Sequence, residues 1–144
     1  MSAQATRVAG MIDAAGEWDV KRPAGWTPTE MFAHVASTIG LTPKIGPGIL
    51  AIPPGVDIIE GLDIAAFNAQ GVERTHSTDS QEAVEKIARY CTRMADWVGT
   101  LTDDQLEGEH TFRGMRMTMS NYLMTVTVMH SIHHLFEAPL SVPA

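Results

Sequence analysis

The chain has 144 residues, of which 44% are hydrophobic and 19% charged, and its formal net charge is −7. This length predicts a single domain over residues 1–144, and the composition supports a buried core and excludes global disorder. The acidic balance excludes nucleic acid as a partner, because phosphate binding requires clustered Lys and Arg.

Three further classes of protein are excluded by simple sequence features. No apolar run approaches the roughly 18 residues that a membrane span needs. The start Met1-Ser2-Ala3-Gln4 lacks the basic and apolar segments of a signal peptide. We therefore expect no membrane partner and a cytoplasmic location. The single cysteine, Cys91, excludes a disulfide framework and a cysteine-rich zinc module.

The first 57 residues predict two helices and one long loop. Apolar residues at helical spacing predict a short helix over about residues 3–15. Thr27-Pro28-Thr29-Glu30 combines an N-cap hydroxyl, an early proline and a capping-box glutamate, so a second helix begins there. Because Gly40 and Pro43 follow, we expect it to end near Thr38 or Ile39. The Pro- and Gly-rich segment Leu41–Asp57 then predicts a long ordered loop, a frequent place for lids and binding sites.

The second half continues the helical pattern. A third helix is predicted over Ile58–Glu73. An apolar seam with alternating spacings of three and four predicts a fourth helix, and its members are Val84, Ile87, Cys91, Met94, Val98 and Leu101. Residues 107–117 lack a helical stripe and predict a turn or a short extended segment. A last helix is predicted from about Thr118 to Glu137. The predicted fold is all-α, an antiparallel four-helix bundle with a long Pro/Gly-rich loop after the second helix.

Histidines are concentrated in the last predicted helix, where three of the six lie within five positions. His130 and His134 are one turn apart on one face, which allows two imidazoles to bind one metal ion. His133 lies about 60° to one side and is a rival ligand. Glu137 shares the face of His134 and could orient an imidazole or act as a general base.

A structural interpretation of the same residues stays open. Histidines near a helix C-terminus can favour the helix dipole or cap carbonyls, and Glu137 can serve as a cap. A metal would also need a third ligand, and His34 lies only at the edge of the apolar arc of its helix. His76 and His110 fall in predicted connections and receive no role, and we expect Trp26 to serve packing.

The segment Trp26-Thr27-Pro28-Thr29-Glu30-Met31-Phe32-Ala33-His34-Val35 resembles the signature of the DinB-like superfamily, in the branch of the mycothiol-dependent maleylpyruvate isomerases. Phe67-Asn68-Ala69, Trp97 through Leu106 and the final His130-Ser131-Ile132-His133-His134 are similar too. The resemblance implies a bundle that holds one divalent metal ion, Zn or Ni, through His34, His130 and His134. It also places Asn68 at an inward polar position that could contact a cofactor.

This resemblance implies a function. Three neutral imidazoles leave a metal its full charge and an open position for water or substrate. We therefore expect a divalent-metal-dependent enzyme that transfers a small thiol such as mycothiol to a small electrophile, or a related isomerase or hydrolase. The alternative is a non-catalytic DinB-like bundle that binds a small ligand or a protein partner. A homodimer is expected because small bundles often bury an additional helical face.

Overall fold

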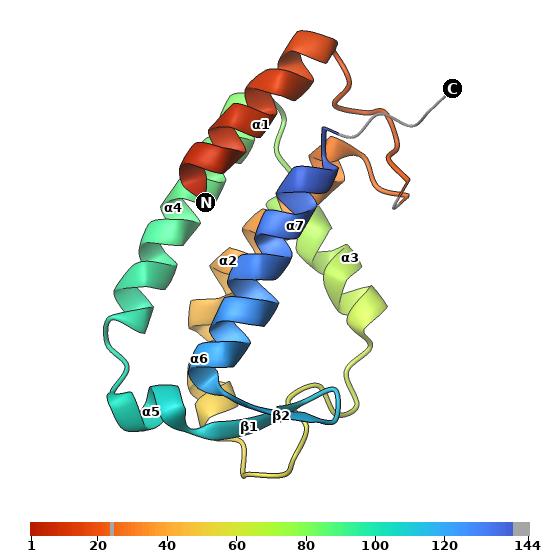
Figure 1. Cartoon of the computed structure of the whole chain (residues 1–144). Helices are drawn as coiled ribbons and strands as arrows, with labels where there is room; N and C mark the ends of the chain where they lie inside the picture. The colour runs from red at the N-terminus through yellow and green to blue at the C-terminus, as the bar shows by residue number, and fades with distance from the viewer. Residues whose placement is uncertain (24, 140–144) are drawn as a thin grey trace.

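The computed structural model describes residues 1–23 and 25–139, in which the chain is mostly helical (Figure 1). The all-α prediction is correct apart from one two-stranded antiparallel hairpin. In chain order the elements are α1 (Ser2–Ala15), α2 (Pro28–Leu50), α3 (Ile64–Thr75), α4 (Ser80–Val98), α5 (Asp103–Glu107), β1 (Glu109–Phe112), β2 (Met115–Thr118), α6 (Met119–Tyr122), the π-helix η1 (Leu123–Met129) and α7 (His130–Glu137).

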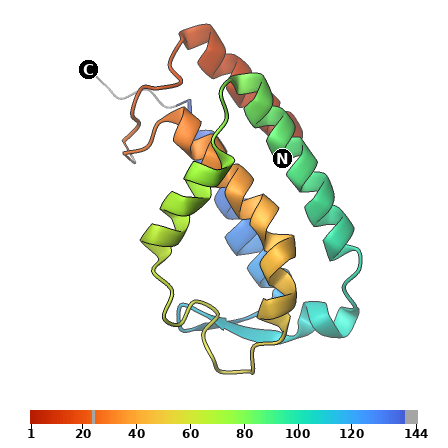
Figure 2. The same ribbon diagram turned by 180° about the vertical axis from the view of Figure 1, so that it is seen from behind.

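Helix α2 is the central element, because it packs against α3, α4 and α7. Helix α1 contacts both α4 and α7, and it lies beside α4 along one side of the molecule (Figure 1). Figure 2 shows the molecule from behind, with α3 packed against α2 on the side away from α4. The hairpin closes the end of the molecule that is far from the C-terminus of α7. Among the helices of the described segments, none is both long and apolar enough to cross a bilayer.

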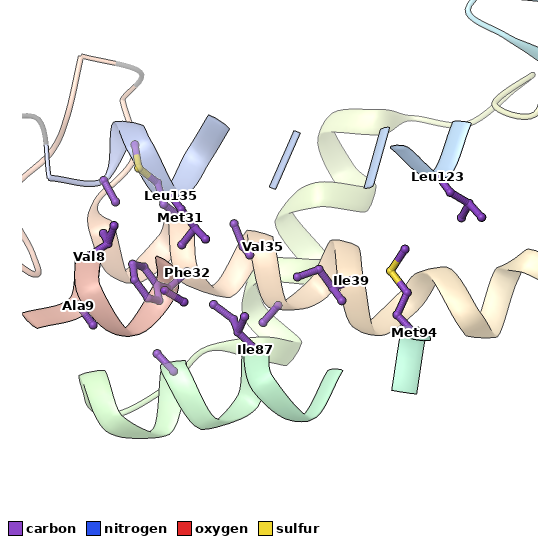
Figure 3. Packing of buried hydrophobic residues seen from close by; sticks show 14 of the residues in the cluster. Val8, Ala9, Met31, Phe32, Val35, Ile39, Ile87, Met94, Leu123 and Leu135 are labelled. Carbon is purple, nitrogen blue, oxygen red and sulfur yellow. The ribbon is translucent and has the colours of Figure 1, made fainter. Parts of the chain in front are cut away.

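The core is built around the apolar side chains of α2. Phe32, Val35 and Ile39 are each no more than 1% exposed. Figure 3 shows them between side chains of the neighbouring helices, with Val8 on α1 and Ile87 on α4 among these. Since α2 has neighbours on several sides, its buried positions extend around much of its circumference instead of forming one narrow stripe.

Helix α2 is longer than predicted. It continues through Pro43 and Pro47 and ends at Leu50, so the predicted loop Leu41–Asp57 is wrong over its first part. The Pro/Gly-rich connection runs instead over residues 51–63. Each internal proline removes one backbone donor, a defect that the helix tolerates because tertiary packing outweighs the local preference.

Two glycines of α2 show how closely this helix packs against its neighbour. A Cβ atom at Gly40 would lie 2.6 Å from the ring of Tyr90, and one at Gly46 would lie 2.2 Å from the ring of Trp97. Both aromatic rings belong to α4. The two glycines therefore allow a close contact between α2 and α4, where the sequence pattern had indicated the end of a helix.

Two other boundaries also differ from or refine the predictions. Helix α3 begins at Ile64 and not at Ile58, because the side chain of Asp63 caps its first turn by accepting from the backbone of Ala66 at 3.0 Å. The predicted extended segment is the β1–β2 hairpin. Its turn is held by the carboxylate of Asp57, which accepts from the backbone N–H of Gly114 at 2.8 Å. Backbone hydrogen bonds from Gly114 and Ile59 lower the pKa of the Asp57 carboxyl.

The substitution Gly46→Ala tests the close contact between α2 and α4. The added methyl group would overlap the Trp97 ring, so we expect the free energy of unfolding to fall by about 1–3 kcal/mol. Gly48→Ala is the matched control, because no atom beyond its chain neighbours and the nearby backbone of its own helix lies within 4 Å of its Cβ position, and the change should stabilise the helix by roughly 0.5–1 kcal/mol. Urea denaturation of both variants measures the difference, and equal effects would contradict the packing argument.

Candidate metal centre

Three histidines meet where the first half of α2 lies against α7. Nε2 of His34 is 2.9 Å from Nε2 of His130. The ring of His134 lies 4.9 Å from that of His34 and 4.6 Å from that of His130, measured between centroids. One ring nitrogen from each residue lies within 4.8 Å of the others, so the three are close enough to hold a metal ion together.

The local sequence explains the relative position of His130 and His134, and it explains where the helix that carries His34 begins. His130 and His134 both lie in α7, where a spacing of four puts them one turn apart. His34 lies one turn after Glu30, in a helix whose start is fixed by a complete capping box. Thr27 Oγ1 accepts from the backbone of Glu30 at 3.2 Å, and Glu30 Oε2 accepts from the backbone of Thr27 at 2.8 Å. Glu30 is therefore engaged at the helix start.

Burial keeps the three imidazoles uncharged. His34 is 4% exposed, and desolvation together with the nearby His134 and His130 lowers its pKa to about 3. Desolvation also lowers the pKa of His130, and the positive charge of Arg113 contributes to that shift. The pKa of His134 is lowered by desolvation against the opposing influence of Glu137. At neutral pH all three rings are thus in the form that binds metal ions.

The donor set suits a transition-metal ion. Imidazole nitrogen is a common ligand of zinc, nickel, copper and iron. Two nitrogens 2.9 Å apart can both lie at the roughly 2.0–2.1 Å that separates zinc from histidine nitrogen. Three such ligands would leave at least one coordination position for a small molecule. The residues therefore fit the divalent ion that the sequence resemblance implies.

Glu137 contacts the outer side of His134. Its Oε2 lies 2.9 Å from Nδ1 of His134, and its Oε1 lies 3.3 Å from Nε2 of His133. A carboxylate on Nδ1 leaves Nε2 of His134 available to the centre and fixes the orientation of the ring. This contact is consistent with the role of orienting an imidazole, one of the roles considered for Glu137. His133, with a side chain 66% exposed, lies outside the cluster.

Asn68 is half-buried on α3, a helix that packs against α2. Thr75, near the end of α3, donates to the carbonyl of Ala33 at 2.6 Å, beside His34 in sequence. Asn68 lies about two turns before Thr75 in α3. Its assignment as a residue that contacts a cofactor stays a prediction.

Two further histidines lie away from the centre. His110 was expected in a connection, but it lies in β1 and is 7% exposed. His76 follows the last turn of α3 and is exposed. Neither belongs to the group that could hold an ion.

Trp26 was expected to serve packing rather than binding, and its ring packs against the histidines as one wall of the candidate centre. It stacks on His134 at 5.8 Å with an interplanar angle of 19°, and its centroid lies 4.8 Å from that of His34 in an edge-on arrangement. The signal that could have identified it is its position directly before the N-cap Thr27. Trp26 therefore lies just outside α2, next to the capping box formed by Thr27 and Glu30.

The π-helix η1 was not predicted, and it directly precedes His130. The rotation of about 100° between successive residues of an α-helix therefore does not apply to Leu123–Met129. The relation between His130 and His134 is unaffected, because both lie after η1. Such wide turns occur frequently near functional sites, and no feature of the hydrophobic pattern announces this one.

No protein-family model matches the chain, and neither a curated protein nor a solved structure matches it. Membership of the DinB-like superfamily therefore stays a proposal based on the motifs described above.

The lowered pKa of His34 predicts a pH-dependent stability of the metal-free protein. Between about pH 3 and pH 6.5 the unfolded chain binds a proton at this residue that the folded chain does not. The free energy of unfolding should therefore fall as the pH decreases through that window. Urea denaturation with a chelator present measures the slope, which should be smaller in His34→Gln. His76→Gln, at an exposed histidine outside the centre, is the control, and an equal loss of slope there would contradict the assignment.

The contact between Glu137 and His134 predicts a second effect. Glu137→Gln should weaken the affinity for zinc by about 10–100-fold, because the ligand would lose its charged hydrogen-bond partner. Titration with zinc against a competing chelator measures the affinity. Glu73→Gln, an exposed change on α3, is the control. An unchanged affinity in Glu137→Gln would rule out the positioning role.

Proposed function

We propose that this protein is a divalent-metal-dependent enzyme of the DinB-like superfamily that joins a small thiol, such as mycothiol, to a small electrophile. A related isomerase or hydrolase reaction would use the same centre. The observation that supports this proposal best is the convergence of His34, His130 and His134, whose ring nitrogens lie within 4.8 Å of one another.

The fold proposed with it is an antiparallel four-helix bundle. Its support is a closed ring of contacts, in which α1 packs on α4, α4 on α2, α2 on α7, and α7 on α1. In this bundle α3 is an additional helix on the outer side of α2. The histidines then lie between two adjacent members of the ring, which is where helical bundles commonly build metal sites.

The chemistry follows from the residues of the centre. When bound, a divalent ion supplies Lewis-acid chemistry, which favours the thiolate form of a thiol or the hydroxide form of water near neutral pH. The three imidazoles provide ligands without neutralising the charge of the ion. Glu137 holds His134 in the required orientation, and Trp26 excludes water from one side. Cys91 packs against the hydrophobic core on α4, so the proposed thiol is a separate small molecule.

Metal analysis tests the centre directly. The purified protein, loaded with zinc or nickel and then freed of excess ion, should retain close to one equivalent. The variant His130→Ala/His134→Ala should retain none, because a single remaining imidazole binds weakly. His76→Ala is the matched control and should behave like the parent protein. A parent protein that cannot be loaded with either ion would rule out the metal-dependent enzyme.

Activity distinguishes the enzyme from the binding-only alternative. A panel of small thiols is combined with a chlorinated aromatic electrophile, and thioether formation with release of chloride is followed. The metal-loaded parent should accelerate the reaction for at least one thiol, and the double histidine variant should not. A metal-loaded parent that is silent across the panel would favour a bundle that binds a small ligand or partner without catalysis.

A further inference from the structure

Arg22 is a buried cation in the segment between α1 and α2. It is 3% exposed, although arginine is rarely buried without partners. Its Nη1 lies 3.0 Å from Oε2 of Glu17. Its Nε donates to the carbonyl of Ala138 at 2.7 Å. Ala138 is the C-cap of α7, so the guanidinium satisfies a carbonyl at the negative end of the helix dipole.

The same residue is tied closely to Trp26. The backbone N–H of Arg22 donates to the carbonyl of Trp26 at 2.8 Å, and the N–H of Gly25 donates to the carbonyl of Arg22 at 2.8 Å. These two bonds close a tight turn, in which Gly25 adopts a φ of +86° that suits glycine. A displacement of Arg22 would therefore be transmitted to Trp26.

The segment meets α7 at two points that are one turn apart. The Trp26 ring stacks on His134, and the Arg22 guanidinium bonds Ala138. The two points are themselves connected, because the backbone N–H of Ala138 donates to the carbonyl of His134 at 3.1 Å. Stacking alone would allow the indole ring to slide or swing away. The buried guanidinium fixes the segment along the helix axis.

We propose that Arg22 is a positioning residue that holds Trp26 against the histidine centre, and that Trp26 thereby slows the exchange of the metal ion and of its small ligands. This inference rests on the proposed metal binding and adds a means by which access to the centre is controlled. The Trp26 ring covers the side of the cluster that His134 and His34 form, and the inference concerns access from this side.

The rate of metal release tests the inference. The zinc-loaded protein is mixed with excess chelator, and release is followed for the parent, Arg22→Met, Trp26→Leu and Trp26→Phe. We expect Arg22→Met and Trp26→Leu to release zinc roughly tenfold faster, the size of effect typical for residues that support metal ligands. Trp26→Phe should stay near the parent rate, because an aromatic ring is kept.

A control separates this effect from a general loss of stability. Gly46→Ala should destabilise the fold through α4 without contacting the Arg22–Trp26 turn. Release from Gly46→Ala at the parent rate would support the inference. Faster release from Gly46→Ala, to the extent seen in Arg22→Met, would overturn it, and so would an unchanged rate in Trp26→Leu.

A measurement without metal keeps the two proposals distinguishable. The emission of Trp26 is obtained as the difference between the parent and Trp26→Phe, and its quenching by acrylamide reports exposure of the ring. The same difference is measured with Arg22→Lys, which keeps the positive charge but loses the Nε donor. Greater quenching in Arg22→Lys supports the positioning role even if the parent binds no metal. Unchanged quenching would overturn that role, whether or not metal binds.

Discussion

The packing of α2 against α4 on one side and α7 on another is the constraint on which the rest of the structure depends. On the α4 side the helix approaches so closely that Gly40 and Gly46 have no space for a side chain. On the α7 side the same helix carries His34 to within 2.9 Å of a second imidazole. Both contacts belong to the same helix, with Gly46 twelve residues beyond His34. The core and the candidate centre are thus parts of one packing arrangement.

The burial of the three histidines determines their protonation state. Uncompensated polar groups in an apolar interface are unfavourable, and three adjacent imidazoles would repel one another if protonated. Burial keeps the cluster neutral, and a neutral set of nitrogens has lone pairs to offer to a cation. The carboxylate of Glu137 contacts Nδ1 of His134 and leaves Nε2 of that ring unoccupied by this contact. The proposed metal would therefore meet ligands that are already oriented.

The segment before α2 connects the fold to the centre in a second way. Arg22 bonds the end of α7, Trp26 lies on His134, and Thr27 begins α2. The described residues of this segment thus contact the C-terminal end of α7 and the N-terminal end of α2. Arg22 has no ring contact with the histidines, and it is connected to them through Trp26.

The sequence by itself determined the features that depend on neighbours in the chain. The capping box at Thr27, the spacing of His130 and His134, the amphipathic α4 and the extended character of the hairpin all follow from interactions over a few residues, and each is present in the structure. Tertiary structure decided the rest. Periodicity left His34 at the edge of the apolar arc of its helix, and in the structure it is buried against Trp26 and the histidines of α7. Gly40 and Pro43 are helix breakers in isolation, yet contact with α4 carries α2 beyond them to Leu50. The place of Trp26 against His34 and His134 likewise depends on which segments lie side by side. Local patterns specify hydrogen bonds within a helix, whereas the burial of one helix face depends on partners that are distant in the sequence.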